Sequence, residues 1–461
     1  MYFLTLKKYR WITLLVASYF FYLNIKPVFA LITLGITIST YLFSRLIEKN
    51  RDDSMKRFFM VINVVIIVLP LFFFKYFGNI NATIYSLLDT IKIRWPLPEI
   101  KLLLPIGISF YTFMAIGYTV DVYNGEIQTE KNPGILALFI SFFPLILSGP
   151  IERAKNLIPQ FRNPRDLNLI MVVSGLKLML WGYFMKLVVA DRLAIYVDAI
   201  FNNISQHNGK SLLLASILYP FQIYADLGGY SLIAIGTASI LGINVIQNFK
   251  RPFLATSMSE FWRRWHISLI SWLTDYIYTP LTFFLRKYKI WGIIIALMIT
   301  FFISGIWHGP KLTFIIWGIL QGLLLSIEAL TNRKKKEFEN KHNLVTKKWY
   351  FILSICLTFI LFSASQIFGR APDLKNAFDV FFRIFQNKGP LFIGSPSTLI
   401  YGILGIFLIL IKDFTDELTP SRFLLFENRS KFVRFLSYSS ILILILLIGV
   451  FDGGQFIYFQ F

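Results

Sequence analysis

The chain has 461 residues, of which 56% are hydrophobic, 17% aromatic and only 15% charged, and its formal net charge is +21. Soluble domains carry about 25% charged residues, so the composition excludes a soluble globular protein and indicates an integral membrane protein. The basic residues lie in short connectors between apolar runs and not on one polar domain, which argues against a nucleic-acid-binding protein.

Uncharged runs that are long enough to cross a hydrocarbon core recur along the whole chain. They span residues 58–74, 102–120, 227–249, 290–307, 349–369 and 389–411. Residues 11–25 form a shorter first run, and because no small-residue cleavage site follows it, we interpret it as an uncleaved first span. Together these runs predict one membrane domain, residues 1–461, with about eleven crossings and some re-entrant or interfacial segments.

Basic residues are concentrated in three connectors. One group precedes the first run at residues 7–10, a second lies at residues 45–57, and a third lies at residues 333–348. The positive-inside rule predicts that all three face the cytoplasm. Two crossings are expected between the first group and the second, which agrees with this orientation.

The stretch at residues 250–280 mixes charged and aromatic side chains. Ser257 and the glutamate three residues later have the spacing of a capping box, which predicts that a helix begins at Met258. Because Pro280 disfavours helical geometry in the residue before it, we expect this helix to end at Thr279.

A histidine lies within this predicted helix among aromatic and basic neighbours. Residues three or four apart are neighbours on a helix surface, so Trp262, His266 and Leu269 are predicted to share one face. Arg263 precedes His266 by three residues. The pattern makes His266 a candidate site residue.

His308 directly follows the uncharged run at residues 290–307. An ionisable residue in this position is costly unless it serves a function, although a histidine that only caps the end of a span is an equal alternative from position alone. Trp307 before it, Gly309 after it and Pro310, which prevents a normal helical continuation, favour a pocket. A neutral histidine there has the chemistry of a general base for a hydroxyl-bearing substrate.

Other reactive groups offer no competing site. His207 and His342 lie in polar connectors and are predicted to be surface residues, and Cys356 lies inside an apolar run without a nearby base. No metal-ligand spacing and no nucleophile elbow occur, so we predict direct transfer without a covalent enzyme intermediate and without a bound metal.

Four further charged residues are embedded near apolar runs: Glu152, Arg153, Asp226 and Asp275. Buried charges usually occur as ion pairs, and basic partners are available along the chain. A structural ion pair is therefore the more frequent role for each of them, and a substrate contact is the alternative.

The ordered motifs resemble those of the membrane-bound O-acyltransferases, and within them the bacterial alginate O-acetylation type. The resemblance covers nearly the whole chain. It is carried by Gly149-Pro-Ile-Glu-Arg153, Phe221-Gln-Ile-Tyr-Ala-Asp-Leu-Gly-Gly-Tyr-Ser231, Asn248-Phe-Lys-Arg-Pro-Phe253, Glu260-Phe-Trp-Arg-Arg-Trp-His-Ile-Ser-Leu269, Asp275-Tyr-Ile-Tyr-Thr-Pro-Leu281, Gly305-Ile-Trp-His-Gly309, Thr313-Phe-Ile-Ile-Trp-Gly318 and the terminal Phe456-Ile-Tyr-Phe-Gln-Phe461.

The resemblance implies an all-α polytopic membrane protein, a ring of about eleven transmembrane helices with re-entrant and interfacial helices around a central tunnel. It implies that His308 is the essential catalytic histidine and His266 the second one. Residues in the matching motifs are candidates for substrate binding: Trp262, Arg263, Arg264, Asp275, Tyr276, Trp307, Gln222 and Asp226.

The implied activity is transfer of an acyl group, most simply acetyl, from a cytosolic donor to a hydroxyl of a cell-envelope polysaccharide or of a partner protein. The implied donor is acetyl-CoA or an acyl-carrier thioester, with no permanently bound cofactor. Expected partners are membrane lipids and an extracytoplasmic acyltransferase of the Ser-Gly-Asn-His (SGNH) type, and the expected location is the bacterial inner (cytoplasmic) membrane.

Two alternatives stay open at this point. One is D-alanyl-type transfer from a carrier protein, and the other is a non-enzymatic transporter or flippase. Leu227 replaces an aromatic residue that is common in the family's motif, so the acceptor is not specified by the sequence.

Overall fold

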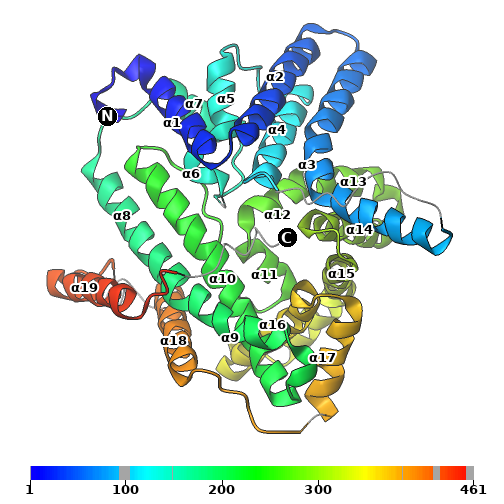
Figure 1. The fold of residues 1–461 in the computed structure, drawn as a ribbon, viewed down its shortest axis with the longest axis vertical. Coiled ribbons are helices and arrows are strands. Elements are labelled where there is room, and N and C mark those ends of the chain that lie inside the picture. The colour runs from blue at the N-terminus through cyan, green and yellow to red at the C-terminus, as the bar shows by residue number, and fades with distance from the viewer. Residues whose placement is uncertain (1, 93–103, 148, 387, 419–425, 453–461) are drawn as a thin grey trace. The chain divides into compact units, whose positions relative to one another are not determined.

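The structure, a computed structural model, describes residues 2–92, 104–147, 149–386, 388–418 and 426–452. Within these ranges it contains helices and turns but no strands (Figure 1). In this part of the chain, nine helices are long and apolar enough to cross a membrane. The prediction of an all-α, multi-pass membrane protein is confirmed, whereas the count of eleven crossings is not.

The nine candidate spans differ in length. They are α2 (Pro27–Lys49), α3 (Asp53–Thr90), the continuous helix Leu169–Phe201, α10 (Gly209–Ile240), α14 (Ile290–His308), α15 (Leu312–Lys341), α16 (Lys348–Arg370), α18 (Pro396–Leu418) and α19 (Lys431–Ile448). The helix Leu169–Phe201 consists of α8 (Leu169–Tyr183), the π-helical turn η3 (Phe184–Ala190) and α9 (Asp191–Phe201). The run at residues 227–249 is therefore not a span of its own, because α10 begins earlier and ends at Ile240.

Shorter helices connect and flank these spans. They are α1 (Arg10–Ile25), α4 (Ile108–Tyr123), α5 (Pro133–Ser141), α6 (Phe143–Ile146), α7 (Ala154–Arg162), α11 (Met258–Arg264), α12 (Ile267–Leu273), α13 (Thr279–Phe284) and α17 (Leu374–Gln386). The expected first span corresponds to α1, which has 16 residues. A helix of this length extends about 24 Å, which is shorter than the roughly 30 Å thickness of a hydrocarbon core.

The chain forms two compact units. Unit 1 comprises residues 1–176 and 234–246, and unit 2 comprises residues 177–233 and 247–461. The boundaries fall within α8, within α10 and just before residue 247. The assignment of the whole chain to one domain stays a prediction.

In unit 1, a buried asparagine links three helices that pack on one another. Asn63 of α3 is fully buried, accepts a hydrogen bond from Ser39 of α2 at 2.6 Å and donates one to Thr119 of α4 at 2.8 Å. Interhelical hydrogen bonds of this kind hold membrane helices together where apolar packing against lipid provides no driving force.

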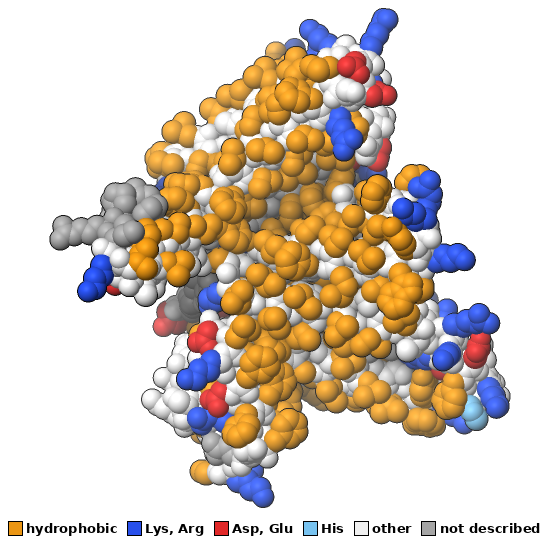
Figure 2. All heavy atoms as spheres, turned by 90° about the vertical axis from the view of Figure 1, so that its right-hand side faces the viewer, with side chains coloured by type: hydrophobic (Ala, Val, Ile, Leu, Met, Phe, Trp, Pro, Cys, Tyr) orange, Lys and Arg blue, Asp and Glu red, His pale blue; other side chains and the backbone are white. Residues whose placement is uncertain are grey.

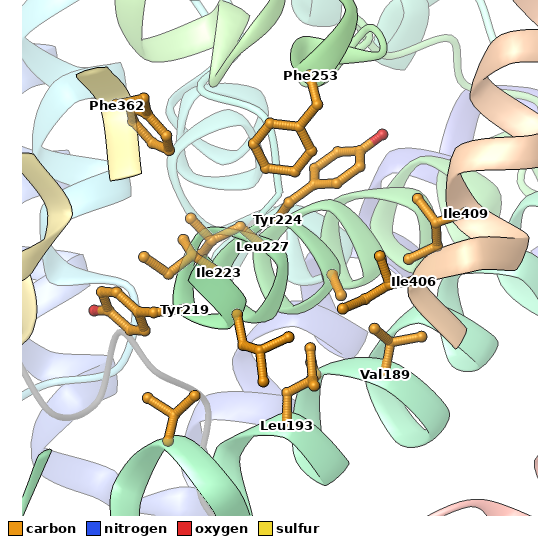
Figure 3. Close-up of a cluster of buried hydrophobic side chains, with 14 of the residues drawn as sticks. Val189, Leu193, Tyr219, Ile223, Tyr224, Leu227, Phe253, Phe362, Ile406 and Ile409 are labelled. Atoms are coloured by element: carbon orange, nitrogen blue, oxygen red, sulfur yellow. The ribbon is translucent and has the colours of Figure 1, made fainter. Parts of the chain in front are cut away.

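In unit 2, α10 supplies the centre of the apolar core. Figure 3 shows Tyr224 of α10 directed toward Phe253, while Val189 and Leu193 lie together with Ile406 and Ile409 of α18. Of the most apolar stretch of α10, 83% is buried, against 11% for α19. Such a contrast is expected when one helix is enclosed by protein and the other faces lipid.

The exposed surface has the character expected of lipid-facing helices. Figure 2 shows hydrophobic side chains covering much of one face, with Lys and Arg side chains gathered toward its margins. On α3 the exposed side chains include Phe58, Val65, Leu69 and Phe72. An apolar surface of this extent is typical of a protein whose helices contact lipid.

The helix predicted for residues 258–279 begins where expected but is not continuous. Ser257 accepts a hydrogen bond from the backbone N–H of Glu260 and α11 begins at Met258, which confirms the capping box. The helix breaks after Arg264, because His266 adopts the left-handed conformation with φ 45° and ψ 49°. The chain then continues as α12, a π-helical turn (η6, Thr274–Tyr278) and α13. The predicted helix end at Thr279 is therefore wrong. Pro280 lies in the first turn of α13, where its missing N–H is tolerated.

Two glycines allow α14 and α15 of unit 2 to pack with their backbones in close contact (Figure 1). A Cβ atom on Gly318 would lie 2.3 Å from the backbone oxygen of Phe301, and one on Gly305 would lie 2.5 Å from that of Phe314. Small residues at membrane helix interfaces commonly permit such close approach. The glycines therefore fix the spacing of the helices that carry His308 and its aromatic neighbours.

We expect Gly318→Ala to destabilise unit 2, because the methyl group meets backbone and the two helices have to separate. Overpacking of this kind costs about 1–3 kcal/mol, which is measurable as a lower melting temperature of the purified protein in detergent. Gly35→Ala in α2 is the matched control, since a Cβ atom there has no neighbour within 4 Å and alanine favours a helix. Equal melting temperatures for the two variants would contradict the assigned role of Gly318.

Candidate active site

His308 is the last residue of α14, and aromatic rings from α15 surround it. Its ring lies 4.8 Å from that of Trp317 in an edge-to-face arrangement and 6.2 Å from that of Phe314, nearly parallel. The absence of a side chain at Gly309 leaves room for Phe314, because a Cβ atom there would lie 2.8 Å from the phenylalanine ring. The helix end at His308 was expected from the glycine and proline that follow it.

His266 lies in the break between α11 and α12, and a distant asparagine holds that break. The backbone carbonyl of Asn248 accepts a hydrogen bond from Ile267 N–H at 2.8 Å. Its side-chain oxygen accepts from the Ser268 N–H at 3.2 Å and from the Ser268 hydroxyl at 2.9 Å. The left-handed conformation costs a non-glycine residue about 1–3 kcal/mol, and these hydrogen bonds hold it in place.

The two predicted catalytic histidines line one cavity of about 60 Å³, which exceeds the roughly 10–15 Å³ that one water molecule needs. All the residues that line it belong to unit 2. Besides His266 and His308, the lining consists of Gln366 and of mainly apolar and aromatic residues: Tyr219, Ile223, Leu227, Trp262, Trp265, Leu269, Phe314, Trp317 and Gly369. Figure 3 shows Tyr219, Ile223 and Leu227 along α10.

The electrostatics of this cavity are set by its lack of formal charge. Among the described residues that line it, none is Asp, Glu, Lys or Arg. In such surroundings a hydrogen bond is stronger than in water. A substrate carbonyl or hydroxyl that enters the cavity is therefore polarised by neutral donors and acceptors.

The two histidines differ in exposure. His266 is 3% exposed, whereas His308 is half-buried, and the ring of Trp307 contacts both, at 6.5 Å from His266 and 4.7 Å from His308. Burial lowers the pKa of His266, which lies outside the nine candidate spans, to about 4. His266 is therefore neutral near pH 7, and His308 is the histidine that a substrate reaches more readily.

Gln366 of α16 is a cavity residue that the sequence reasoning did not identify. It is 6% exposed and lines the cavity together with His266 and His308. An amide inside the uncharged run at residues 349–369 was the available signal. Sequence spacing gave no means of connecting it to histidines on other elements.

The remaining predicted substrate-binding residues are distributed over the cavity wall and its surroundings. Trp262 lines the cavity and Trp307 contacts both histidine rings. Gln222 is buried on α10 but is not among the lining residues. Their roles in substrate binding stay predictions.

Four predicted substrate-binding residues on α11 and η6 lie outside the cavity lining: Arg263, Arg264, Asp275 and Tyr276. Arg263 is exposed, and Arg264 forms ion pairs with Glu260 at 2.7 Å and with Glu417 at 2.9 Å. Asp275 is exposed, and Tyr276 packs its ring 5.0 Å from that of Trp272. Their roles in substrate binding likewise stay predictions.

Asp226 belongs to a buried charged cluster and not to the cavity lining. Lys186 of η3 forms ion pairs at 2.7 Å with both Asp191 and Asp226, and its ammonium lies 5.1 Å from the centre of the Tyr230 ring. Buried charges are stable when they are paired and hydrogen-bonded in this way. This is the structural ion pair that the sequence analysis gave as the more frequent role for an embedded charge such as Asp226.

Glu152 of unit 1 likewise has a structural environment. Its carboxylate accepts hydrogen bonds from the backbone N–H of Ile246 at 2.5 Å and from the side-chain amide of Asn156 at 2.8 Å. In the part of the chain that the structure describes, no group of three or more His, Cys, Asp or Glu side chains is arranged to hold a metal ion. The terminal motif at residues 456–461 lies outside the described residues.

Comparison with known proteins identifies the family. A model of the membrane-bound O-acyltransferase (MBOAT) family matches residues 122–368, a range that contains both cavity histidines and Gln366. The chain belongs to this family. The MBOAT protein is similar to curated proteins with three different acceptors.

One relative is the probable alginate O-acetylase AlgI of Pseudomonas putida, with 32% identity over 91% of this chain and 86% of the relative. A second is the peptidoglycan O-acetyltransferase of Helicobacter pylori, with 31% identity over 80% of this chain and 72% of the relative. A third is the teichoic acid D-alanyltransferase of Streptococcus thermophilus, with 28% identity over 68% of this chain and 75% of the relative. The MBOAT protein is thus a multi-pass membrane O-acyltransferase.

We expect Asn248→Ala to lower both the stability and the turnover of this MBOAT protein. The Ser268 N–H and hydroxyl lose their acceptor in a buried position, which costs about 1–3 kcal/mol, and the break at His266 keeps only its backbone hydrogen bonds, among them the one from Ile267 N–H to residue 248. Thermal unfolding and acyl-transfer assays of the purified protein measure the two effects. Asn24→Ala is the control, because this exposed asparagine bonds only within α1; a variant at Asn248 that matches it in both assays would contradict the role.

Proposed function

We propose that this chain transfers a small acyl group, most simply acetyl, from a cytosolic thioester donor to a hydroxyl of a cell-envelope polysaccharide or of an extracytoplasmic partner protein. The observation that carries the proposal is that His266 and His308, which lie 42 residues apart on different elements, line the same uncharged cavity. Two of the relatives are named as acetyl-transfer enzymes for alginate and for peptidoglycan, which supports acetyl as the group.

In this proposal His308 acts as the general base. The acceptor hydroxyl donates its proton to the His308 imidazole while its oxygen attacks the thioester carbonyl carbon. The carbon–sulfur bond then breaks, and the proton passes from His308 to the leaving thiolate. His266, which is neutral near pH 7, assists by orienting the substrate without adding charge to the cavity.

The dimensions of the cavity support a short acyl group. Its volume is about 60 Å³ and its walls are largely aromatic, which suits a small apolar group beside the histidines. One added methylene changes affinity in an apolar pocket by about 1–3 kcal/mol.

The family resemblance suggests the donor and the partner in this proposal. Acetyl-CoA or an acyl-carrier thioester supplies an activated acyl group from the cytosol, and an SGNH-type acyltransferase on the other side of the inner membrane completes transfer to a polysaccharide. Similarity to a teichoic acid D-alanyltransferase supports D-alanyl transfer from a carrier protein as the second candidate. Membership of an acyltransferase family makes a transporter the weaker alternative.

We expect purified protein in lipid nanodiscs to cleave acetyl-CoA and pass labelled acetyl to a hydroxyl acceptor. His308→Ala should lower turnover by at least about 100-fold, the usual minimum contribution of a general base, and His266→Ala should lower it as well. Release of free CoA and transfer of label measure the two halves of the reaction.

His342→Ala is the matched control, because His342 follows the end of α15 in a polar connector and is exposed. Its turnover should equal that of the unmodified chain. Carrier protein loaded with D-alanine, tested in parallel, decides between the two donors. Full activity in His308→Ala with either donor would overturn the proposed mechanism.

A further inference from the structure

The side chain of Gln366 has an unusual environment for an amide. It is 94% buried, because only 6% of the residue is exposed, and it lines the cavity that contains His266 and His308. Among the residues that the structure describes, none forms a hydrogen bond with this side chain. Its polar atoms are not among the fully buried ones, so the amide keeps some open surface in the cavity, and a ligand there can complete its hydrogen bonding.

A second buried glutamine nearby differs from Gln366 because its side-chain N–H is bonded to the neighbouring helix, although its side-chain oxygen has no partner. Gln321 of α15 is fully buried, and its side-chain N–H donates to the Ser365 hydroxyl at 2.6 Å, which in turn donates to the backbone oxygen of Phe362. Gln321 is not among the residues that line the cavity. The α15–α16 interface thus contains one glutamine that joins the helices and one that faces the cavity.

The residue one turn after Gln366 keeps its amide accessible. A Cβ atom on Gly369 would lie 3.3 Å from the Gln366 side-chain oxygen, and Gly369 itself lines the cavity. A larger residue at this position would press on the amide and fill the space beside it. The glycine leaves that space free for a substrate atom.

We propose that Gln366 contacts the substrate and that its side-chain N–H donates a hydrogen bond to the acyl carbonyl oxygen. This inference rests on the proposed function and assigns a residue to it. As the acceptor hydroxyl oxygen bonds to the carbonyl carbon, the carbonyl π electrons move to the oxygen. The amide N–H stabilises that negative charge until the carbon–sulfur bond breaks and the thiolate leaves with the proton from His308.

An amide suits this task in an uncharged cavity. It donates a hydrogen bond at every pH without titrating, and in water-poor surroundings such a donor stabilises a developing oxyanion strongly. A lysine or arginine at the same place would have to be buried as an unpaired charge. Gln366 provides the stabilisation without that cost.

The test uses Gln366→Met, which keeps the length of the side chain and removes its polar atoms. We expect kcat to fall by about 100- to 1000-fold, the effect of removing one oxyanion donor, with a small change in KM. The melting temperature should stay equal or rise, because the substitution removes an unpartnered buried amide. A merely structural role predicts a lower melting temperature instead.

Gln321→Met is the matched control, since it removes a bonded amide from the same helix interface. Its melting temperature should fall while its kcat stays within a few-fold of the unmodified chain. A Gln366→Met variant with unchanged kcat, or with a melting temperature that falls as far as that of Gln321→Met, would overturn the inference. His308→Ala run alongside separates the two hypotheses: if it is inactive while Gln366→Met is fully active, only the role of Gln366 fails, and if it is active, the proposed function fails.

Discussion

Each backbone N–H that leaves a helix in apolar surroundings needs a hydrogen-bond partner inside the protein. The break between α11 and α12 meets this requirement through residues on a different segment. Lys250 N–H donates to the Arg264 carbonyl at 2.8 Å, and Ile267 N–H donates to the Asn248 carbonyl at 2.8 Å. With the backbone groups on both sides of the break paired, His266 keeps a left-handed conformation that an isolated chain rarely adopts. The position of His266 in the cavity depends on these bonds.

The other side of the cavity depends on how closely two helices approach. Gly305 and Gly318 bring the backbones of α14 and α15 together, and the rings of Phe314 and Trp317 then stand beside His308. Large aromatic side chains fill the space that small residues leave. The result is a site with few polar groups, each of which has a strong effect because its surroundings are largely apolar.

Two charged clusters of unit 2 contain ion pairs and lie outside the lining of this cavity. Lys186 lies between Asp191 and Asp226, and Arg264 bonds to Glu417. Such ion pairs join neighbouring elements of the unit. Acyl transfer between neutral groups, in which charge appears only transiently, suits a cavity of this kind.

The sequence by itself determined that the protein lies in a membrane and is helical, that α14 ends at His308 and that α11 begins at Met258. These features depend on hydropathy and on neighbouring residues, such as Ser257 as a cap and Pro310 as a break, so local reasoning reaches them. The tertiary structure decided the rest. The turn at His266 depends on Asn248, which is 18 residues away, and the meeting of His266, His308 and Gln366 depends on which helices pack together. Residue spacing along one helix contains no information about that pairing, because the partners lie on separate segments whose contacts form only when the chain folds.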